Sequence, residues 1–142
     1  MYYRCDLCRR LTGEYEYRKG KIIVFDLDGT LSIPGDRLKY LDNKDWDSFY
    51  AACDQDEPNQ PIVDTFKSFE SKGYAMKIVT GRRDKEKNKT LQWLRRNNID
   101  ISPENIHMRK TGDYRHDTKV KPELIKDFAI EPCIIGVIFV GD

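Results

Sequence analysis

The sequence predicts an α/β fold with a Rossmann-like parallel sheet that is covered by helices on both faces. Four short apolar runs alternate with helix-like segments along the chain, and strands that alternate with helices form parallel sheets. Three of these runs end in polar residues suited to chemistry, and the remaining one is followed closely by Arg109. Because ligands bind beyond the carboxyl ends of parallel strands, we expect these polar residues to meet at one site.

The expected strands are short apolar runs. Residues 22–25 form a continuous run of β-branched and aromatic residues, bounded by Gly20 and Gly29. Such runs are typical of parallel strands that are buried on both faces. The other strands of the sheet are expected at residues 75–79, 106–108 and 134–140.

Helices are expected between these strands. The clearest covers residues 61–72, where Pro61 suits the first helical position and Gly73 ends the pattern. An apolar stripe of Ile62, Phe66 and Phe69 gives this helix a face that can be buried. Further helices are expected at residues 46–52, 84–97 and 122–128, the last with Val120 and Lys121 leading into it.

Length and composition fit one soluble domain with a real core. The chain has 142 residues, of which 39% are hydrophobic and 35% charged. The formal net charge of +1 gives no global basic field, so nucleic-acid binding must rest on local charge. No apolar run approaches the roughly 20 residues that span a membrane, and no signal-peptide stretch is present. A cytoplasmic location is therefore the default expectation.

The segment Asp26-Leu27-Asp28-Gly29-Thr30 has the clearest chemical character. An extended backbone sends the two carboxylates to the same side, about 6–7 Å apart, where they repel unless a cation or a shared proton intervenes. Magnesium prefers such hard oxygen ligands. Gly29 lets the backbone turn sharply and present N–H groups to an anion, and Thr30 adds a hydroxyl. The segment can therefore hold a metal and attack a phosphorus atom.

Residues 24–31 resemble the first motif of the haloacid dehalogenase superfamily of phosphatases. Val79-Thr80-Gly81-Arg82 resembles the second motif, a strand that ends in a phosphate-binding Thr or Ser. Lys121 fits the third motif, and Gly141-Asp142 fits the start of the fourth, acidic motif. The resemblance covers residues 21–142 in the expected order, and it implies the α/β fold predicted above.

A second stretch resembles a narrower family. Residues 108–117, together with Val120-Lys121, are similar to the Arg…Asp-x-Arg-x-Asp…Val-Lys pattern in the 3′-phosphatase domain of phage polynucleotide kinase–phosphatase. Thr80-Gly81-Arg82 also suits that family. The resemblance therefore implies a substrate with a phosphorylated nucleic-acid end or a nucleotide.

The resemblance also implies catalytic roles that make physical sense. Asp26 would attack the phosphorus and carry the phosphoryl group, and Asp28 would protonate the leaving oxygen and then activate water. Magnesium would be held by the Asp26 carboxylate, the Asp28 carbonyl and Asp142. Thr80 and backbone N–H groups near Gly29 would hold the nonbridging oxygens. Lys121, with Lys119 as its rival, would balance the negative charge.

Arginines near the sheet edge are candidate substrate contacts, because the planar guanidinium suits phosphate. Acidic residues beside them would orient the arginines or lie in surface turns. The basic residues of one helical stretch are expected mostly to coat a solvated surface: Arg83, Lys85, Lys87, Lys89, Arg95 and Arg96. The candidate substrate-binding residues are Gly29, Thr30, Gly81, Arg82, Arg109, Asp113, Arg115 and Asp117.

The spacing of the motifs predicts a domain with little or no cap. About 50 residues separate Thr30 from Thr80 and about 40 separate Thr80 from Lys121, which leaves no room for an extra domain. An open site admits a large substrate such as a nucleic-acid end. We expect residues 21–142 to form the phosphatase domain, short at its C-terminus, and residues 1–20 to form a small appendage with a strand and a Cys pair.

Cys5 and Cys8 have the spacing of half a zinc site. A second pair is missing, so zinc within one chain, zinc shared between chains, a redox pair and two idle thiols all stay open. The chain stops at Asp142, whereas related domains usually continue beyond the fourth motif.

The function expected from the sequence is magnesium-dependent hydrolysis of phosphomonoesters through a phospho-aspartate intermediate, with 3′-phosphorylated nucleic-acid ends as the substrate. Two alternatives stay open. The chain could be a nucleotidase that acts on nucleoside monophosphates, or a degenerate phosphatase that serves as a binding module.

Overall fold

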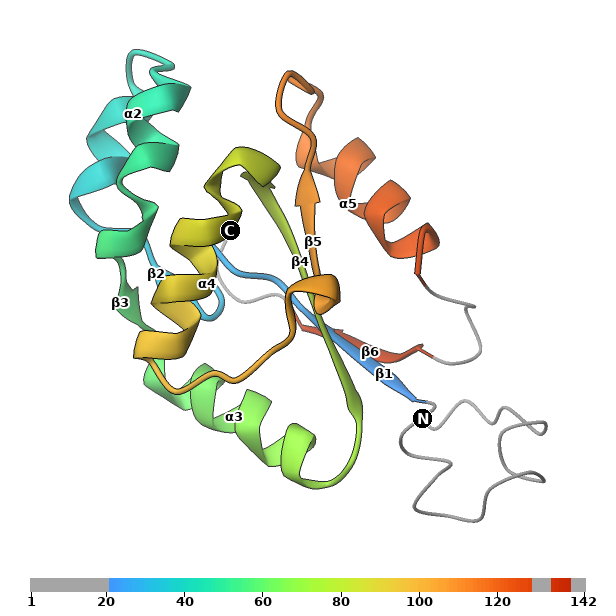
Figure 1. The fold of residues 1–142 in the computed structure, drawn as a ribbon. Coiled ribbons are helices and arrows are strands. Elements are labelled where there is room, and N and C mark those ends of the chain that lie inside the picture. The colour runs from blue at the N-terminus through green and yellow to red at the C-terminus, as the bar shows by residue number, and fades with distance from the viewer. Residues whose placement is uncertain (1–20, 129–133, 139–142) are drawn as a thin grey trace.

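The structure is a computed structural model, and it describes residues 21–128 and 134–138 (Figure 1). At its centre lies a parallel sheet of four strands in the order β5-β4-β1-β6. This sheet confirms the predicted α/β class. The strands are β1 (Ile22–Phe25), β4 (Ala75–Arg83), β5 (Ile106–Arg109) and β6 (Ile134–Ile138).

Helices cover both faces of this sheet. In Figure 1, α3 (Gln60–Ser71) and α4 (Lys87–Arg96) lie on one side and α5 (Asp117–Lys126) lies on the other. The connection from β1 to α3 contains α2 (Trp46–Ala51) and a small antiparallel sheet of β2 (Ser32–Ile33) and β3 (Glu57–Pro58). The remaining described helices are single 3₁₀ turns or pairs of turns: η1 (Asp36–Leu41), η2 (Cys53–Gln55), η3 (Asp84–Glu86) and η4 (Pro103–Asn105).

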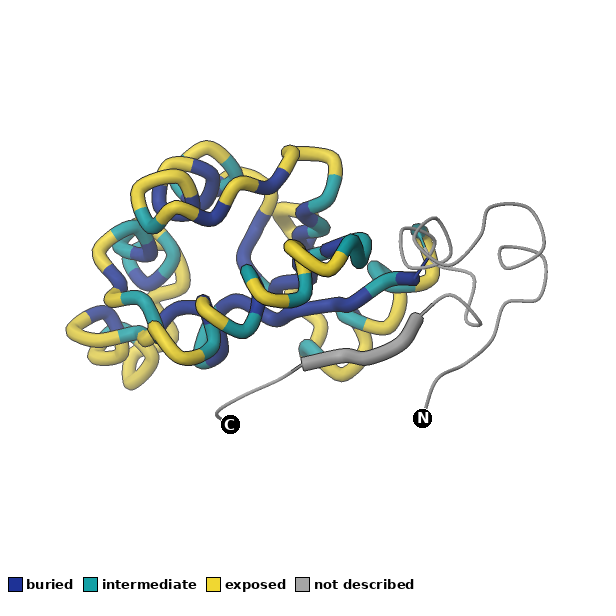
Figure 2. The backbone as a smooth tube through the Cα atoms, turned by 90° about the horizontal axis from the view of Figure 1, so that it is seen from below, coloured by how far each residue is buried: buried dark blue, intermediate teal, exposed yellow. Residues whose placement is uncertain are grey.

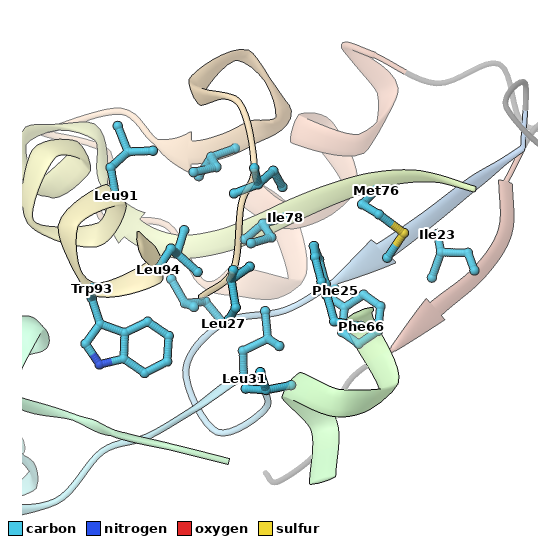
Figure 3. Close-up of a cluster of buried hydrophobic side chains, with 14 of the residues drawn as sticks. Ile23, Phe25, Leu27, Leu31, Phe66, Met76, Ile78, Leu91, Trp93 and Leu94 are labelled. Carbon is cyan, nitrogen blue, oxygen red and sulfur yellow. The ribbon is translucent and has the colours of Figure 1, made fainter. Parts of the chain in front are cut away.

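The main hydrophobic core lies between β1, β4 and the helices α3 and α4 (Figure 3). Phe25 of β1 meets Phe66 of α3 edge to face, with ring centroids 5.1 Å apart. Both side chains are fully buried. Figure 2 shows the buried strand path inside the exposed outer turns of the helices. The core therefore fixes the carboxyl ends of β1 and β4 next to each other.

Two predicted boundaries differ from the structure. The second strand was expected to end at residue 79, but β4 continues to Arg83, with an irregular register to β5 between Thr80 and Arg83. The last helix was expected to begin at Pro122, which is wrong, because α5 begins at Asp117. His116 caps the helix by accepting a hydrogen bond from the Thr118 N–H, and histidine is not among the usual cap residues.

The helix expected at residues 84–97 consists of η3 followed by α4. Small elements between β1 and α3, including η1 and the β2–β3 pair, were not expected, because they lack a long apolar period. The Cys pair, the strand expected within residues 1–20 and Asp142 lie outside the described residues. No helix in the described ranges is both long and apolar enough to cross a membrane.

Candidate active site

Asp26 follows β1 directly and lines a cavity of about 620 Å³. Only 7% of the residue is exposed. The Nζ atom of Lys121, on α5, lies 3.2 Å from Asp26 Oδ1 and 3.3 Å from Asp117 Oδ2. Lys119, its rival in the sequence, is exposed. The structure therefore brings Asp26 and Lys121 together, although they are far apart in the sequence.

The pKa of the Asp26 carboxyl lies above its ordinary value. Burial raises the pKa because the charged form loses water, and the charge of Lys121 only partly offsets this effect. The Leu27 N–H also stabilises the carboxylate, and the nearby Asp28 opposes it. The negative charge of Asp26 is thus incompletely compensated by the protein, so a cation or a proton near it would be stabilised.

Several backbone N–H groups of the turn after Asp26 donate hydrogen bonds within the turn itself. Gly29 has a positive φ of 81°, which favours glycine. Its N–H donates to the Ser32 carbonyl at 2.8 Å, and the Thr30 N–H donates to the Leu27 carbonyl at 3.1 Å. The sequence predicted that N–H groups here would face an anion, but these two are engaged within the turn.

Asp28 is held by two arginines from different parts of the chain. Its Oδ1 accepts hydrogen bonds from Arg82 Nη2 at 2.7 Å, Arg82 Nε at 2.9 Å and Arg37 Nη2 at 2.7 Å. Both arginines also bind Asp56, at 2.7 Å from Arg37 and 3.3 Å from Arg82. We call these four residues the Asp28 cluster. It contains two positive and two negative charges.

The Asp28 cluster is anchored in the core of the domain. Arg82 is fully buried and its Nη1 donates to Thr90 of α4. The indole N–H of Trp93, also on α4, donates to the Asp56 carbonyl at 2.7 Å. Burial alone would raise the pKa of Asp28, but the charges of Arg82 and Arg37 outweigh it and hold the pKa below its ordinary value.

Asp28 nevertheless keeps access to the cavity. Its side chain is 26% exposed and lines the cavity beside Asp26. All the side-chain donors that reach it from the described residues meet Oδ1 and not Oδ2. These contacts therefore fix the side chain through one oxygen, at a position that lines the cavity.

Arg109 organises the loop between β5 and α5. Its guanidinium donates to the carbonyl oxygens of Gly81 and Asp113, at 2.9 and 3.0 Å, and binds the Asp117 carboxylate. Asp117 also packs so closely on Gly81 that a Cβ atom there would lie 2.5 Å from its Oδ1. Arg109, Gly81 and Asp117 therefore depend on one another for their positions.

The predicted site residues separate into two groups. Thr30, Thr80 and Arg82 are fully buried and lie behind the cavity, where the Thr80 hydroxyl accepts a hydrogen bond from the Arg82 N–H at 3.1 Å. Asp142 lies outside the described residues. The predicted residues that line the cavity are Asp26, Asp28, Gly29, Gly81, Arg109, Asp113, Arg115, Asp117 and Lys121.

Sequence reasoning missed Arg37, Asp56 and Arg83. Arg37 and Asp56 lie between the motifs, where no spacing or periodicity marks them, and only the folded chain shows that they hold Asp28. Arg83 was grouped with the basic residues of a solvated helix. It instead ends β4, is 7% exposed, lines the cavity and binds Asp47 and Glu86.

The donor set fits magnesium in type. The carboxylate of Asp26 is a hard oxygen ligand, and its raised pKa shows a charge that a cation would stabilise. Within residues 21–128, no group of three or more His, Cys, Asp or Glu side chains gathers as a metal site. A magnesium ion here would therefore need backbone oxygens, water or ligands beyond the described residues.

Comparison with known proteins identifies the family. The model of the polynucleotide kinase PNKP phosphatase domain family matches residues 20–132. The chain belongs to this family. The match covers Asp26, Asp28, Thr80 and Lys121, so the resemblance to haloacid dehalogenase-type phosphatases seen in the motifs is confirmed.

Solved structures support the same assignment for this phosphatase domain. It is similar to a chain in a structure of the Pnkp1/Rnl/Hen1 complex, with a TM-score of 0.70, 28% identity and coverage of 83% of this chain and 38% of that one. A chain in a structure of the Pnkp1/Rnl/Hen1 RNA repair complex matches with a TM-score of 0.68 and 30% identity. This alignment covers 81% of this chain and 34% of that one. The phosphatase domain thus spans little more than a third of these relatives.

A more distant likeness concerns the fold alone. The class C acid phosphatase from Bacillus anthracis, solved with tungstate bound, matches with a TM-score of 0.51 and 19% identity. The alignment covers 88% of this chain and 63% of that one. The parallel sheet with helices on both faces is therefore shared beyond the narrower family.

Proposed function

We propose that this domain is a magnesium-dependent phosphomonoesterase that removes the phosphate from 3′-phosphorylated nucleic-acid ends. One observation carries the proposal: Asp26 and Asp28 line the same cavity, and the Lys121 Nζ atom lies 3.2 Å from the Asp26 carboxylate. A carboxylate beside a fixed cation can attack phosphorus, and a second carboxylate in the same cavity can transfer protons. Family membership supports phosphoryl chemistry for this pair.

In the proposed first step, an Asp26 carboxylate oxygen forms a bond to phosphorus as the bond from phosphorus to the 3′ oxygen breaks. The leaving oxygen takes the electron pair and receives a proton from Asp28. The pKa of Asp28 is low in the resting site, but a dianionic phosphate nearby raises it and favours the protonated form. Lys121 balances charge on Asp26 and on the phosphoryl group.

In the second step, a water molecule attacks the phosphorus and gives a proton to Asp28. The bond between phosphorus and Asp26 breaks, so both carboxylates return to their starting states and phosphate leaves. The arginines of the Asp28 cluster favour the ionised form of Asp28, which suits a base. Magnesium would be held by the Asp26 carboxylate, the Asp28 carbonyl and Asp142, and it would supply charge that offsets repulsion between Asp26 and the phosphate.

The substrate class rests on the family and on the cavity. The structural relatives include a chain of an RNA repair complex. The cavity lining includes four cationic side chains, those of Arg83, Arg109, Arg115 and Lys121, next to four carboxylates. We propose that residues 21–142 form the phosphatase domain. Zinc binding by Cys5 and Cys8 stays a prediction, as these residues lie outside the described ranges.

The test is phosphate release, with magnesium, from a 3′-phosphorylated oligonucleotide, its 5′-phosphorylated twin and a nucleoside monophosphate. We expect preferential release from the 3′ end, and Asp26→Asn should remove it because the amide cannot act as the nucleophile. Preference for the monophosphate would favour the nucleotidase alternative. Release from none of the three, by folded protein, would contradict the proposal and favour a binding module.

A further inference from the structure

Exposed apolar side chains gather at the mouth of the active-site cavity. The described residues expose five large hydrophobic side chains, and four of them line this cavity. Isolated apolar residues on a surface are normal, but a cluster in a concave site marks a binding surface. The four are Leu38, Leu41, Trp46 and Tyr114, and the fifth, Ile33, lies outside the cavity.

These side chains come from two segments that flank β4. Leu38 and Leu41 belong to η1 and Trp46 begins α2, in the connection that follows β1, whereas Tyr114 belongs to the loop that follows β5. Because β4 lies between β1 and β5 in the sheet, the two segments stand on either side of its carboxyl end (Figure 1). The cavity therefore has an aromatic side chain in each wall.

Trp46 is held in place by the aromatic residues of its own helix. It stacks on Tyr50, with ring centroids 6.2 Å apart and an interplanar angle of 25°, and meets Phe49 edge to face. The Tyr50 hydroxyl donates to the Gly81 carbonyl at 3.1 Å, which ties the helix to the end of β4. Trp46 is nevertheless 41% exposed. It thus presents a preformed aromatic surface.

Tyr114 is the more exposed of the two, at 81%. Its loop is fixed at both ends, since Thr111 donates to Asp84 and Arg109 donates to the Asp113 and Arg115 carbonyls. No ring among the described residues packs on the Tyr114 ring. A fixed loop therefore holds an aromatic side chain that has no aromatic partner within the described part of the chain.

A phosphorylated nucleic-acid end, the substrate proposed above, combines an anionic group with flat apolar surface. The phosphate would lie at Asp26 and Lys121, and phosphate alone leaves the apolar walls uncovered. Nucleobases stack on aromatic side chains whatever their sequence, and such platforms are typical of sites for single strands. A base that stacks on protein leaves its own duplex stack, which costs least when the base is unpaired.

We propose that Trp46 and Tyr114 stack on nucleobases at the phosphorylated end, so that the domain acts on unpaired 3′ ends in preference to paired ones. This inference rests on the proposed function for the phosphate position. It goes further in naming the substrate class as single-stranded and the aromatic residues that select it. Leu38 and Leu41 provide apolar surface beside Trp46.

The kinetic test compares two 3′-phosphorylated single strands, one of which lacks the terminal base. For the wild-type domain, kcat/KM for the strand without the base should be lower by about fivefold to a hundredfold. In Trp46→Ala and Tyr114→Ala this difference should shrink, while Ile33→Ala, an exposed residue outside the cavity, should keep it. Equal kcat/KM for both strands with the wild-type domain would overturn the inference.

A binding test stands apart from phosphate release. The chain has two tryptophans, and Trp93 is fully buried whereas Trp46 is exposed, so quenching of tryptophan fluorescence by a strand reports on Trp46. We expect a 3′-phosphorylated thymidine oligonucleotide to quench it, and to do so less when annealed to a complementary strand that pairs its end. Absence of quenching by the single strand, or equal quenching by both, would overturn the inference.

These two tests separate the failure of the inference from the failure of the proposed function. Quenching by the single strand without phosphate release would refute the proposed chemistry and support stacking at the cavity. Phosphate release from the 3′ end with no dependence on the terminal base would refute stacking and support the chemistry.

Discussion

Two carboxylates only two residues apart lie in opposite environments. Asp26 contacts one lysine that also binds Asp117, and burial raises its pKa. Asp28 belongs to a cluster in which two arginines bridge two carboxylates, and its pKa is lowered. The domain thus keeps the charge of Asp26 poorly compensated and that of Asp28 well compensated.

This difference indicates how one turn can serve two chemical tasks. In the proposed reaction, Asp26 is the nucleophile, and its incompletely compensated charge would be stabilised by a cation. Asp28, held in position by two arginines, is the proposed acid and base. The contrast arises from distant parts of the chain, since the compensating cations come from α5 for Asp26 and from η1 and β4 for Asp28.

Among the substitutions considered, Arg82→Met should lower the free energy of unfolding the most, because it removes one of the two arginines that bind Asp28. It would leave Asp28 and Asp56 with only Arg37, and the loss of one partner from a buried ion pair destabilises a protein by about 3–5 kcal/mol. Urea unfolding measures this change. The control is Arg115→Gln, because Arg115 is half exposed and its partners lie at the surface. A similar unfolding midpoint for both variants would show that the Asp28 cluster does not carry stability.

Lys121→Met should increase the difference between the pKa values of Asp26 and Asp28. Without the lysine, burial of Asp26 is less opposed, so its pKa rises further. Because the nucleophile must be ionised, the acid limb of the pH profile of kcat/KM should move to higher pH. Lys119→Met, on the same helix and exposed, should leave the limb in place. An unmoved limb in Lys121→Met would mean that this lysine does not set the ionisation of Asp26.

Asp26→Asn should have the smallest effect on stability, and an unusual sign. A carboxyl whose pKa is raised in the folded state contributes stability below its unfolded pKa, and that contribution is lost as pH rises through the folded pKa. At neutral pH the variant with the neutral amide should therefore unfold at a higher urea concentration than the wild type, although we expect it to be inactive. For Asp28 the pH dependence of stability is opposite. Its pKa is lowered in the folded state, so its contribution to stability is present above the unfolded pKa and is lost as pH falls through the folded pKa. A less stable Asp26→Asn at neutral pH would contradict this account.

The sequence predicted the sheet from local patterns, and its resemblance to the phosphatase family implied that Lys121 would lie near Asp26, which the structure places 3.2 Å away. It did not predict the Asp28 cluster, since Arg37 and Asp56 lie in a stretch without periodicity. Arg82 shows a second limit. The sequence marked Arg82 as a candidate phosphate contact because of its guanidinium. In the structure it is buried and binds Asp28 and Asp56, which are distant in sequence.

The connection between β1 and α3 has a consequence for how such enzymes diversify. It supplies Leu38, Leu41 and Trp46 to the cavity wall and also Arg37 and Asp56 to the support of Asp28. The proposed recognition and the proposed catalysis therefore depend on the same segment of this domain. Exchange of the segment with that of a relative would replace both at once, so new specificities should arise by point changes on its exposed side chains and not by grafting the whole loop.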